Sequence, residues 1–334
     1  MKNGSMVLCI LGAMIGAGFA SGRELMQFFS RWGQYSWAFV GCAAAMMTAC
    51  MIRLMRRGEC GMDSLFPEGK GARFCRLFLA ALLIVTGGGM TAAAGGVCAL
   101  ILPIHNARAM GYLGTLLLAV WAARYPLRAL AALGKILIPA LLIAFALCFR
   151  LPGENQFPVF SAGELIMGLL QALAYAGMNV MLSAGVLCEA GGQCNPRGFC
   201  RGATWSGGAI GMLLLLGNGV LLPHRESLMH EALPMVILLR GYGKWGYYLS
   251  AGVLYLAIMT TLIALLRGMG EIFRGKMRYP YACAGVVAGI TGLIGFEEIV
   301  AKAYPMLGII SLLLIWLPKK KARSYPERVC GQHH

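Results

Sequence analysis

Long apolar stretches alternate with short polar or basic segments along the whole chain. A helix needs about 20 apolar residues to cross the hydrocarbon core of a bilayer. Ten stretches meet or approach that length, and they lie at residues 5–29, 36–54, 75–102, 109–123, 127–149, 164–188, 203–222, 245–272, 280–295 and 299–317. We therefore predict an all-α integral membrane protein with about ten transmembrane helices, which form a single domain over residues 1–318. Residues 223–243 are amphipathic and are expected to form short helices across the outer mouth.

The amino-acid composition agrees with a membrane protein. Hydrophobic residues make up 59% and charged residues 13% of the 334 residues, whereas about a quarter of the residues in a soluble domain are charged. The net charge of +16 does not indicate a nucleic-acid partner, because the basic residues lie at the ends of apolar stretches and not on a face with aromatic side chains. The twelve cysteines include no C-x-x-C pair, so neither a zinc site nor a redox motif is predicted.

The basic residues also predict the orientation of the chain. With ten spans, 21 of the 29 Lys and Arg fall on the side that holds both chain ends. Loops rich in Lys and Arg remain in the cytoplasm. We therefore expect both termini in the cytoplasm, including the short basic tail of residues 319–334, with the lipid bilayer around the spans. The oligomeric state is not indicated.

The first stretch cannot easily form one continuous helix. It contains glycines at positions 12, 16, 18 and 22, followed directly by Arg23 and Glu24. Each interior Gly costs a helix about 1 kcal/mol relative to Ala, and unpaired backbone at membrane depth is tolerated only where it is buried or lines a cavity. The alternative is close helix packing, because the glycines also form two G-x-x-x-G patterns. Two charged residues in the same segment favour an unwound segment that lines a site.

The sixth stretch carries a polar stripe. Tyr175, Asn179 and Ser183 recur every four residues and share one helical face, so they must face either a neighbouring helix or a cavity. The first and sixth stretches each open a half of five spans, and five spans invert the second half relative to the first. Interrupted helices at matching places in two inverted halves are typical of a transporter with its site at the midplane. Freed N–H and C=O groups there suit a zwitterionic amino acid.

Two of these segments resemble known families. The run Gly12-Ala-Met-Ile-Gly-Ala-Gly-Phe-Ala-Ser-Gly-Arg-Glu24 resembles the first span of the YkvI-type amino-acid permeases of bacteria. The segment Tyr175-Ala-Gly-Met-Asn179 is similar to the sixth span of branched-chain amino-acid carriers, where an Asp usually takes the Asn position. The resemblance implies the LeuT-like fold of the amino acid–polyamine–cation superfamily, a 5+5 inverted repeat with halves at about 5–149 and 164–317, and the cytoplasmic membrane of a bacterium.

The LeuT-like pattern implies a sodium site between the first and eighth spans. Two carbonyls would come from the first span, and one carbonyl and two hydroxyls from the eighth; the matching residues are Gly12, Ile15, Ala257, Thr260 and Thr261. Oxygen ligands are those that a hard cation requires. Alternatively, both threonine hydroxyls bond back to their own helix. In some proton-coupled relatives a lysine on span five resembles a replacement for this sodium, and Lys135 is the candidate. The alternative is that Lys135 snorkels to the cytoplasmic face.

The resemblance and the interrupted helices together predict a substrate site at the midplane. Its residues are Ile15, Gly16, Ala17, Gly18, Phe19, Tyr175, Gly177, Met178 and Asn179. The fold's pattern also implies an ionic outer gate between Arg23 and either Glu298 or Glu297, with Glu24 as another partner for Arg23. Glu189 is expected in a solvated loop at the inner end of the sixth span.

Four function classes are conceivable for such a chain: a transporter, an enzyme, a channel and a receptor. We predict a secondary transporter for cation-coupled symport of a small amino acid, with sodium or a proton as the coupling ion and no organic cofactor. No H-E-x-x-H or G-x-S-x-G motif and no carboxylate pair lies within a span, so an enzyme is not predicted. A channel would need rings of charge or a filter loop, which the sequence does not show. A receptor that binds an amino acid without moving it would use the same fold and stays open as an alternative.

Overall fold

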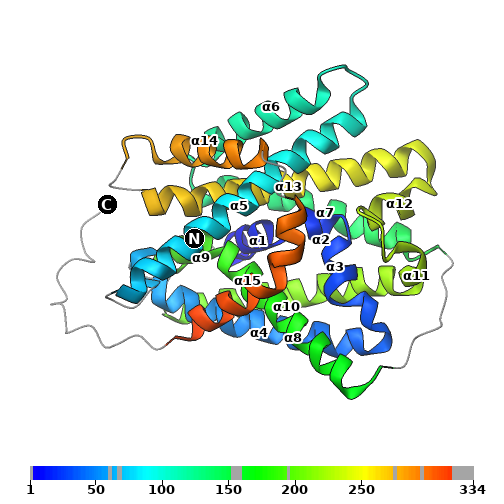
Figure 1. Cartoon of the computed structure of the whole chain (residues 1–334), viewed down its shortest axis with the longest axis horizontal. Coiled ribbons are helices and arrows are strands. Elements are labelled where there is room, and N and C mark those ends of the chain that lie inside the picture. The colour runs from blue at the N-terminus through cyan, green and yellow to red at the C-terminus, as the bar shows by residue number, and fades with distance from the viewer. Residues whose placement is uncertain are drawn as a thin grey trace.

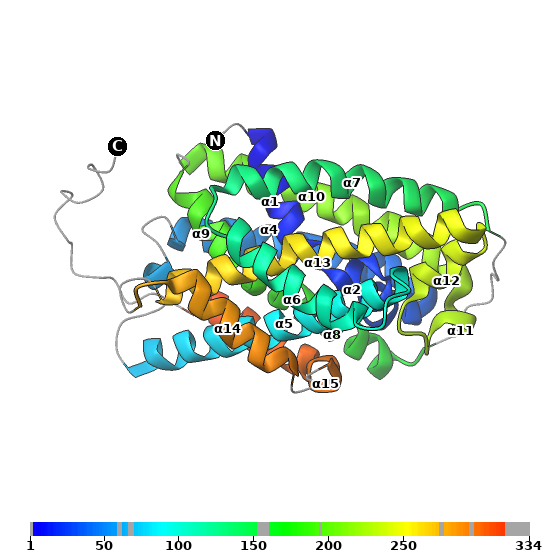
Figure 2. The same cartoon turned by 90° about the horizontal axis from the view of Figure 1, so that it is seen from above.

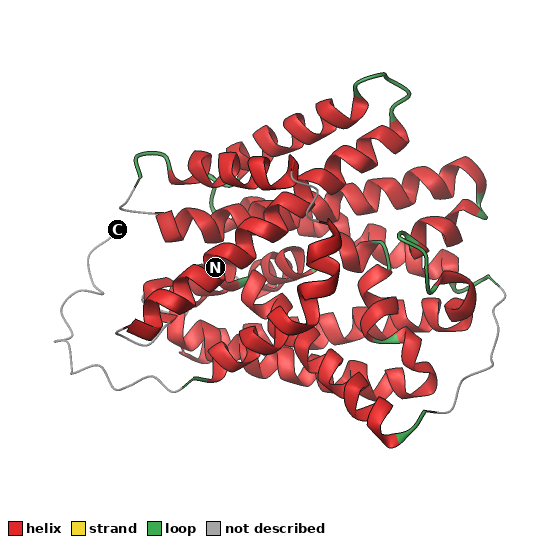
Figure 3. Cartoon of the chain, viewed as in Figure 1, coloured by secondary structure: helices red, strands yellow, loops and turns green. Residues whose placement is uncertain are grey.

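A computed structural model describes residues 3–58, 62–65, 70–151, 160–193, 196–273, 277–293 and 297–317. The described chain is helical throughout and contains no strand (Figure 3). Its principal helices are α1 (Asn3–Met14), α2 (Ala17–Ala20), α3 (Arg23–Phe28), α4 (Ser36–Arg57), α5 (Lys70–Ile101), α6 (Ala107–Ala122), α7 (Leu127–Cys148), α8 (Ala162–Leu182), α9 (Ala184–Gly192), α10 (Pro196–Leu221), α13 (Gly243–Phe273), α14 (Pro280–Leu293) and α15 (Glu297–Trp316).

These helices lie where the apolar stretches predict them. Six segments of the described chain are long and apolar enough to cross a membrane, and four shorter apolar helices, within α1, α6, α14 and α15, have 10–17 residues. The first span is not one helix, because two breaks divide it into the shorter helices α1, α2 and α3. The predicted short helices between the seventh and eighth spans are also present, as a 3-10 turn at Leu222–His224, α11 (Arg225–Leu228) and α12 (Pro234–Arg240).

The interrupted first span lies in the middle of the bundle. α1 packs against α7, α10 and α13, and α2 packs against α13, so both segments are surrounded by other helices (Figures 1 and 2). α8 packs along α15 and α4, and α5 packs against α6, α13 and α14. The core is therefore built around a span whose backbone is irregular, as is required of irregular backbone at membrane depth.

A buried polar cluster joins the start of the second span to the end of the seventh. The Ser30 hydroxyl donates to the Asn218 side-chain oxygen over 2.9 Å, and the Asn218 amide donates to the Ser36 hydroxyl over 2.9 Å. All three side chains are fully buried. Each buried polar group needs a partner, so these bonds set the position of α10 against the 3-10 helix η1 (Ser30–Tyr35) and the start of α4.

Candidate substrate and ion site

The first span is interrupted between α1 and α2. Gly16 is extended, with φ −88° and ψ −179°, and its N–H bonds to the Met14 carbonyl over 3.1 Å. In a continuous helix this N–H would bond to the Gly12 carbonyl, so the Gly12 oxygen loses its regular partner. A second break follows at Gly22, whose φ of +82° is a left-handed conformation that glycine adopts without strain.

The break in the first span faces two threonines of α13. The Thr261 hydroxyl donates to the Ile15 carbonyl oxygen, with 3.3 Å between the two oxygens. A methyl group built on Gly12 would lie 3.8 Å from the Thr260 Cβ, so these two residues are in direct contact. The Thr260 hydroxyl donates to the Ala257 carbonyl over 3.0 Å. The five residues predicted as sodium ligands thus lie together, and Thr261 bridges the helices while Thr260 bonds within its own.

Lys135 lies away from this group of oxygens. Its neighbour Gly134 is buried, and a methyl group there would lie 2.7 Å from the Leu8 carbonyl of α1. The Lys135 side chain is exposed on the outer surface of α7. Adjacent residues on a helix point in different directions, so Lys135 does not share the face through which Gly134 packs on α1. The exposed side chain agrees with a lysine that extends along the helix surface, and a coupling role for Lys135 stays a prediction.

The sixth span is interrupted later than the sequence predicts. α8 is continuous through Leu182, and the break between α8 and α9 falls at Ser183, which has φ −88° and ψ 6°. The backbone of Tyr175 to Asn179, expected to be unwound, is therefore part of a regular helix. One reason is local, because Ala172, Ala174 and Ala176 favour a helix. The other is packing, because the single Gly177 lies against α15, where an added methyl group would be 2.5 Å from the Gly308 carbonyl.

The predicted side chains of the sixth span are buried, and Tyr175 packs on Phe28 and Phe29. Tyr175, Met178 and Asn179 are buried, with exposed fractions of 1%, 1% and 6%. Asn179 donates its amide to the Tyr175 carbonyl over 3.0 Å, so in this conformation it bonds to its own helix. The Ser183 hydroxyl is buried and has no hydrogen-bond partner. This part of the predicted site consists of side chains from α8 and the hydroxyl at its end.

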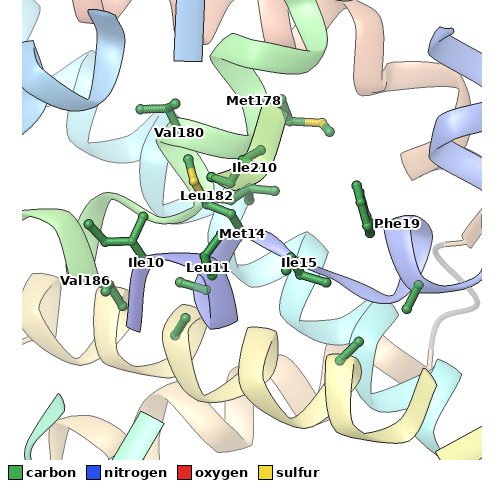
Figure 4. Packing of buried hydrophobic residues seen from close by; sticks show 14 of the residues in the cluster. Ile10, Leu11, Met14, Ile15, Phe19, Met178, Val180, Leu182, Val186 and Ile210 are labelled. Atoms are coloured by element: carbon green, nitrogen blue, oxygen red, sulfur yellow. The ribbon is translucent and has the colours of Figure 1, made fainter. Parts of the chain in front are cut away.

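Apolar side chains enclose the backbone of Ile15 to Phe19. Ile15 and Phe19 are each 2% exposed, and Ala17 and Gly18 are partly buried. The Phe19 ring lies 6.3 Å from the Phe145 ring of α7, measured between centroids. Figure 4 shows Met14 and Ile15 where α1 ends, Phe19 beyond the extended segment, and Met178 above them. Burial of Ile15 and Phe19 lowers the local dielectric at the break, which strengthens polar interactions made there.

Glu24 is the residue of this region that sequence reasoning undervalued. It is 9% exposed, and its carboxyl group lies beside the Tyr175 phenol of α8. Its Oε2 atom is buried and has no hydrogen-bond partner. The sequence suggested only that its charge favours an unwound segment and that it pairs with Arg23, which is exposed. The signal that could have identified it is its spacing, six residues after Gly18, in a span interrupted by glycines.

The predicted outer gate falls partly outside the described structure. Arg23 begins α3 and its backbone N–H bonds to the Ser21 hydroxyl over 3.4 Å. Glu297 and Glu298 begin α15, but their side chains lie outside the described residues. The pairing of Arg23 with either glutamate stays a prediction.

An ion pair at the other end of the bundle corrects the expectation for Glu189. The Arg267 side chain of α13 donates from Nε to a Glu189 oxygen of α9 over 3.1 Å, and a second nitrogen also contacts that carboxylate. Arg267 donates further to the carbonyls of Ala123, over 2.9 Å, and Tyr125. The side chains are only 9% and 27% exposed. Glu189 is thus bound within the protein, and one arginine joins three separate elements.

Comparison with known proteins extends these observations. No protein-family model matches the sequence. The chain is 21% identical to the uncharacterized membrane protein YkvI of Bacillus subtilis (strain 168) over 321 residues, covering 91% of this chain and 92% of that protein. It is 22% identical to the uncharacterized protein YyaD of the same strain over 334 residues, covering 92% of this chain and 94% of the relative.

A solved structure has the same fold. The crystal structure of MhsT in complex with L-phenylalanine superimposes with a TM-score of 0.73, at 13% identity, over 94% of this chain and 88% of MhsT. The resemblance to YkvI-type proteins with a LeuT-like fold, predicted from the first span, is thereby confirmed. The chain is a multi-pass membrane protein that is similar to YkvI over nearly its whole length and shares the fold of MhsT.

Proposed function

We propose that this protein is a secondary transporter that carries a small amino acid across the cytoplasmic membrane of a bacterium together with a cation. The observation that carries the proposal is the break at Ile15–Gly16, buried at the centre of the bundle and bonded to Thr261. An irregular backbone is tolerated at membrane depth when it lines a site. The fold is one in which a solved relative, MhsT, is in complex with L-phenylalanine.

The packing of the helices supports ten spans in two inverted halves. α1 packs on α7 and α8 packs on α15, so the first span of each half contacts the last span of that half. In the same way, α5 packs on α6 and α13 packs on α14, which pairs the third and fourth spans. The two second spans, α4 and α10, pack on each other. Matching contacts in both halves are expected if each half is one copy of a repeat.

The substrate in this proposal is a zwitterion held across the interrupted spans. Backbone groups from Ile15 to Phe19 would bind its carboxylate and ammonium, and Tyr175 and Met178 would contact its side chain. Asn179 would exchange its present bond to the Tyr175 carbonyl, 3.0 Å long, for a polar group of the substrate. Such an exchange costs little free energy, because one hydrogen bond replaces another.

Sodium is the coupling ion that the oxygen atoms near the break fit best. The Ile15 carbonyl and the Thr261 hydroxyl already meet across two helices. The Gly12 carbonyl has lost its regular helical partner, because the Gly16 N–H is bonded elsewhere. The carbonyl of Ala257 and the hydroxyl of Thr260 complete a set of five hard oxygen donors, the chemistry that sodium requires. Sodium bound there would tie the first span to the eighth.

Transport would then follow from movement of one group of helices against another. Spans one, two, six and seven, namely α1 to α4 and α8 to α10, would rock against the remaining spans. The Arg267–Glu189 pair joins α13 to α9 and would hold the inner side closed. At the outer side, Arg23 with Glu297 or Glu298 would serve as the corresponding gate. Both termini would lie in the cytoplasm, as the distribution of basic residues predicts.

Uptake into proteoliposomes tests the proposal. A radiolabelled mixture of L-amino acids would be supplied under an inward sodium gradient, an inward proton gradient, or neither. We expect accumulation under the sodium gradient and loss of that accumulation in the Thr261→Ala variant. Thr204→Ala is the matched control, because Thr204 is exposed on α10 and its hydroxyl bonds only to the Cys200 carbonyl of its own helix.

Two results would contradict the proposal in different ways. If Thr261→Ala and the wild-type protein accumulate amino acids equally under a sodium gradient, the assigned ion site is wrong. If the wild-type protein binds an amino acid but neither accumulates nor exchanges it, the protein is a receptor and not a transporter.

A further inference from the structure

The Glu24 side chain is buried, and one of its two carboxyl oxygens has no hydrogen-bond partner. Its side chain folds back over Gly18, where an added methyl group would overlap the carboxyl group. The Tyr175 phenol lies beside the carboxyl group, and the Oε2 atom has no hydrogen-bond partner. The Tyr175 ring is in turn packed by Phe28 and Phe29, with centroids 5.3 Å and 5.1 Å away. The carboxyl group therefore lies between Gly18 and the side of Tyr175, next to the breaks in the first span.

No described basic side chain faces this carboxyl group. α3 packs against α2, η1, α10 and α8, and α2 has no ionisable residue. Arg23, the nearest basic residue in the sequence, is exposed. The other ionisable side chains on the described parts of these elements lie elsewhere: Glu164 caps α8 with Ser161, Arg31 lies over the Trp32 ring, Tyr35 packs on Phe160, and Arg201 is exposed.

A charged carboxylate in this place would be strongly unfavourable. Removing a carboxylate from water costs several kcal/mol, even after relaxation, when no counter-charge accompanies it. One phenol hydrogen bond to a charged group would return only about 1.5–3 kcal/mol. In the closed arrangement the carboxyl group therefore needs a proton, and water entering from one side would allow it to ionise.

We propose that Glu24 is a proton-binding residue of the transport cycle, so that a proton crosses the membrane with the amino acid. This inference rests on the proposed function, and it adds a proton to the sodium assigned to Thr261 and its neighbours. The chemistry is a simple proton transfer. When the outer side is open, the Glu24 carboxylate takes a proton from hydronium and leaves water. When the inner side is open, the O–H bond breaks and the proton passes to water in the cytoplasm.

The location of Glu24 explains why its protonation is coupled to movement. α3 continues from the interrupted first span, while Tyr175 is on α8, so Glu24 lies where the two discontinuous spans pack together. Neutralising Glu24 removes the cost of burying it and permits the two segments to pack together. Because Gly18 belongs to the proposed substrate site and contacts the Glu24 side chain, substrate binding and burial of the acid occur in the same place.

The test measures proton entry directly. Proteoliposomes containing a pH-sensitive dye would receive the mixture of L-amino acids with equal sodium on both sides. We expect the lumen to acidify with wild-type protein and to stay unchanged with Glu24→Gln. The amide has the same shape and can still lie beside the Tyr175 phenol, so the variant should fold. Exchange of labelled for unlabelled amino acid, which needs no net proton movement, is expected to continue.

Two control variants, Glu24→Asp and Glu231→Gln, make the test decisive. Glu24→Asp retains a titratable acid and should restore acidification, and Glu231→Gln removes an exposed carboxylate and should leave acidification intact. Acidification by Glu24→Gln at the wild-type rate would overturn the inference, as would loss of amino-acid binding together with exchange, since Glu24 would then hold the substrate's ammonium group. A wild-type protein that exchanges amino acids without acidification would also overturn it, and would leave the proposed function standing.

Discussion

The Arg267–Glu189 pair gives a quantitative prediction about the inner side of the bundle. In Glu189→Gln the shape of the side chain is kept and its negative charge is removed. Arg267 would keep its bonds to the carbonyls of Ala123 and Tyr125. The variant therefore weakens only the connection between α13 and α9, which the proposed movement would separate.

The size of the effect follows from the contacts. Arg267 makes two contacts to the Glu189 carboxylate, one of them 3.1 Å long, and both side chains are mostly buried. Hydrogen bonds between charged groups contribute about 1.5–3 kcal/mol each, and replacing a charged partner by a neutral one loses roughly half of that. We expect the closed inner side to lose about 2 kcal/mol, and at about 1.4 kcal/mol per factor of ten this raises the open population about thirtyfold.

Cys9 provides a native reporter of opening. Its thiol is fully buried and donates to the Leu127 carbonyl over 2.9 Å, and α1 packs against both α9 and α13, which carry Glu189 and Arg267. Alkylation of Cys9 by a maleimide, followed by mass spectrometry, should therefore speed up in proportion to the open population. Amide hydrogen exchange in α1 should rise as well, and it does not depend on thiol ionisation.

A second ion pair supplies the control. Glu226 bonds to Arg225 over 2.7 Å, but the two residues are adjacent in one helix and Glu226 is 62% exposed. Glu226→Gln should leave both measurements at wild-type values. Unchanged Cys9 alkylation and unchanged exchange in Glu189→Gln would refute the reasoning, because the pair would then not hold the inner side closed.

Three further predictions concern packing and buried polar groups. Gly177→Ala should destabilise the protein by about 1–3 kcal/mol through overpacking, since its methyl group would lie 2.5 Å from a backbone carbonyl of α15; thermal unfolding in detergent would measure this. Gly208→Ala, which meets nothing within 4 Å, should be neutral or stabilising by up to about 1 kcal/mol in the same assay. Asn218→Leu should lower the unfolding temperature, because it leaves the buried hydroxyls of Ser30 and Ser36 without their partner, at about 1–3 kcal/mol for each unpaired group; an unfolding temperature equal to that of wild type would contradict it.

Local sequence was sufficient where a property depends on neighbouring residues alone. The spans follow from runs of apolar residues, and the break in the first span follows from Gly12, Gly16 and the residues around them, because a backbone rich in glycine gains little from helix formation. The two threonines of the eighth span were also identifiable, because they interrupt an otherwise apolar run. Their meeting with Ile15 was predicted only through the resemblance to a known fold.

Only the tertiary structure decided which polar groups meet and which remain alone. A helical stripe shows that Tyr175 and Asn179 share a face, but not that the first lies beside Glu24 and the second bonds its own helix. Likewise, the sequence places Glu189 near the end of a span, and only the packing of α9 on α13 brings it to Arg267. The physical reason is that pairing and burial depend on helices far apart in the chain, and a carboxyl group has the same sequence signature in water as in a closed bundle.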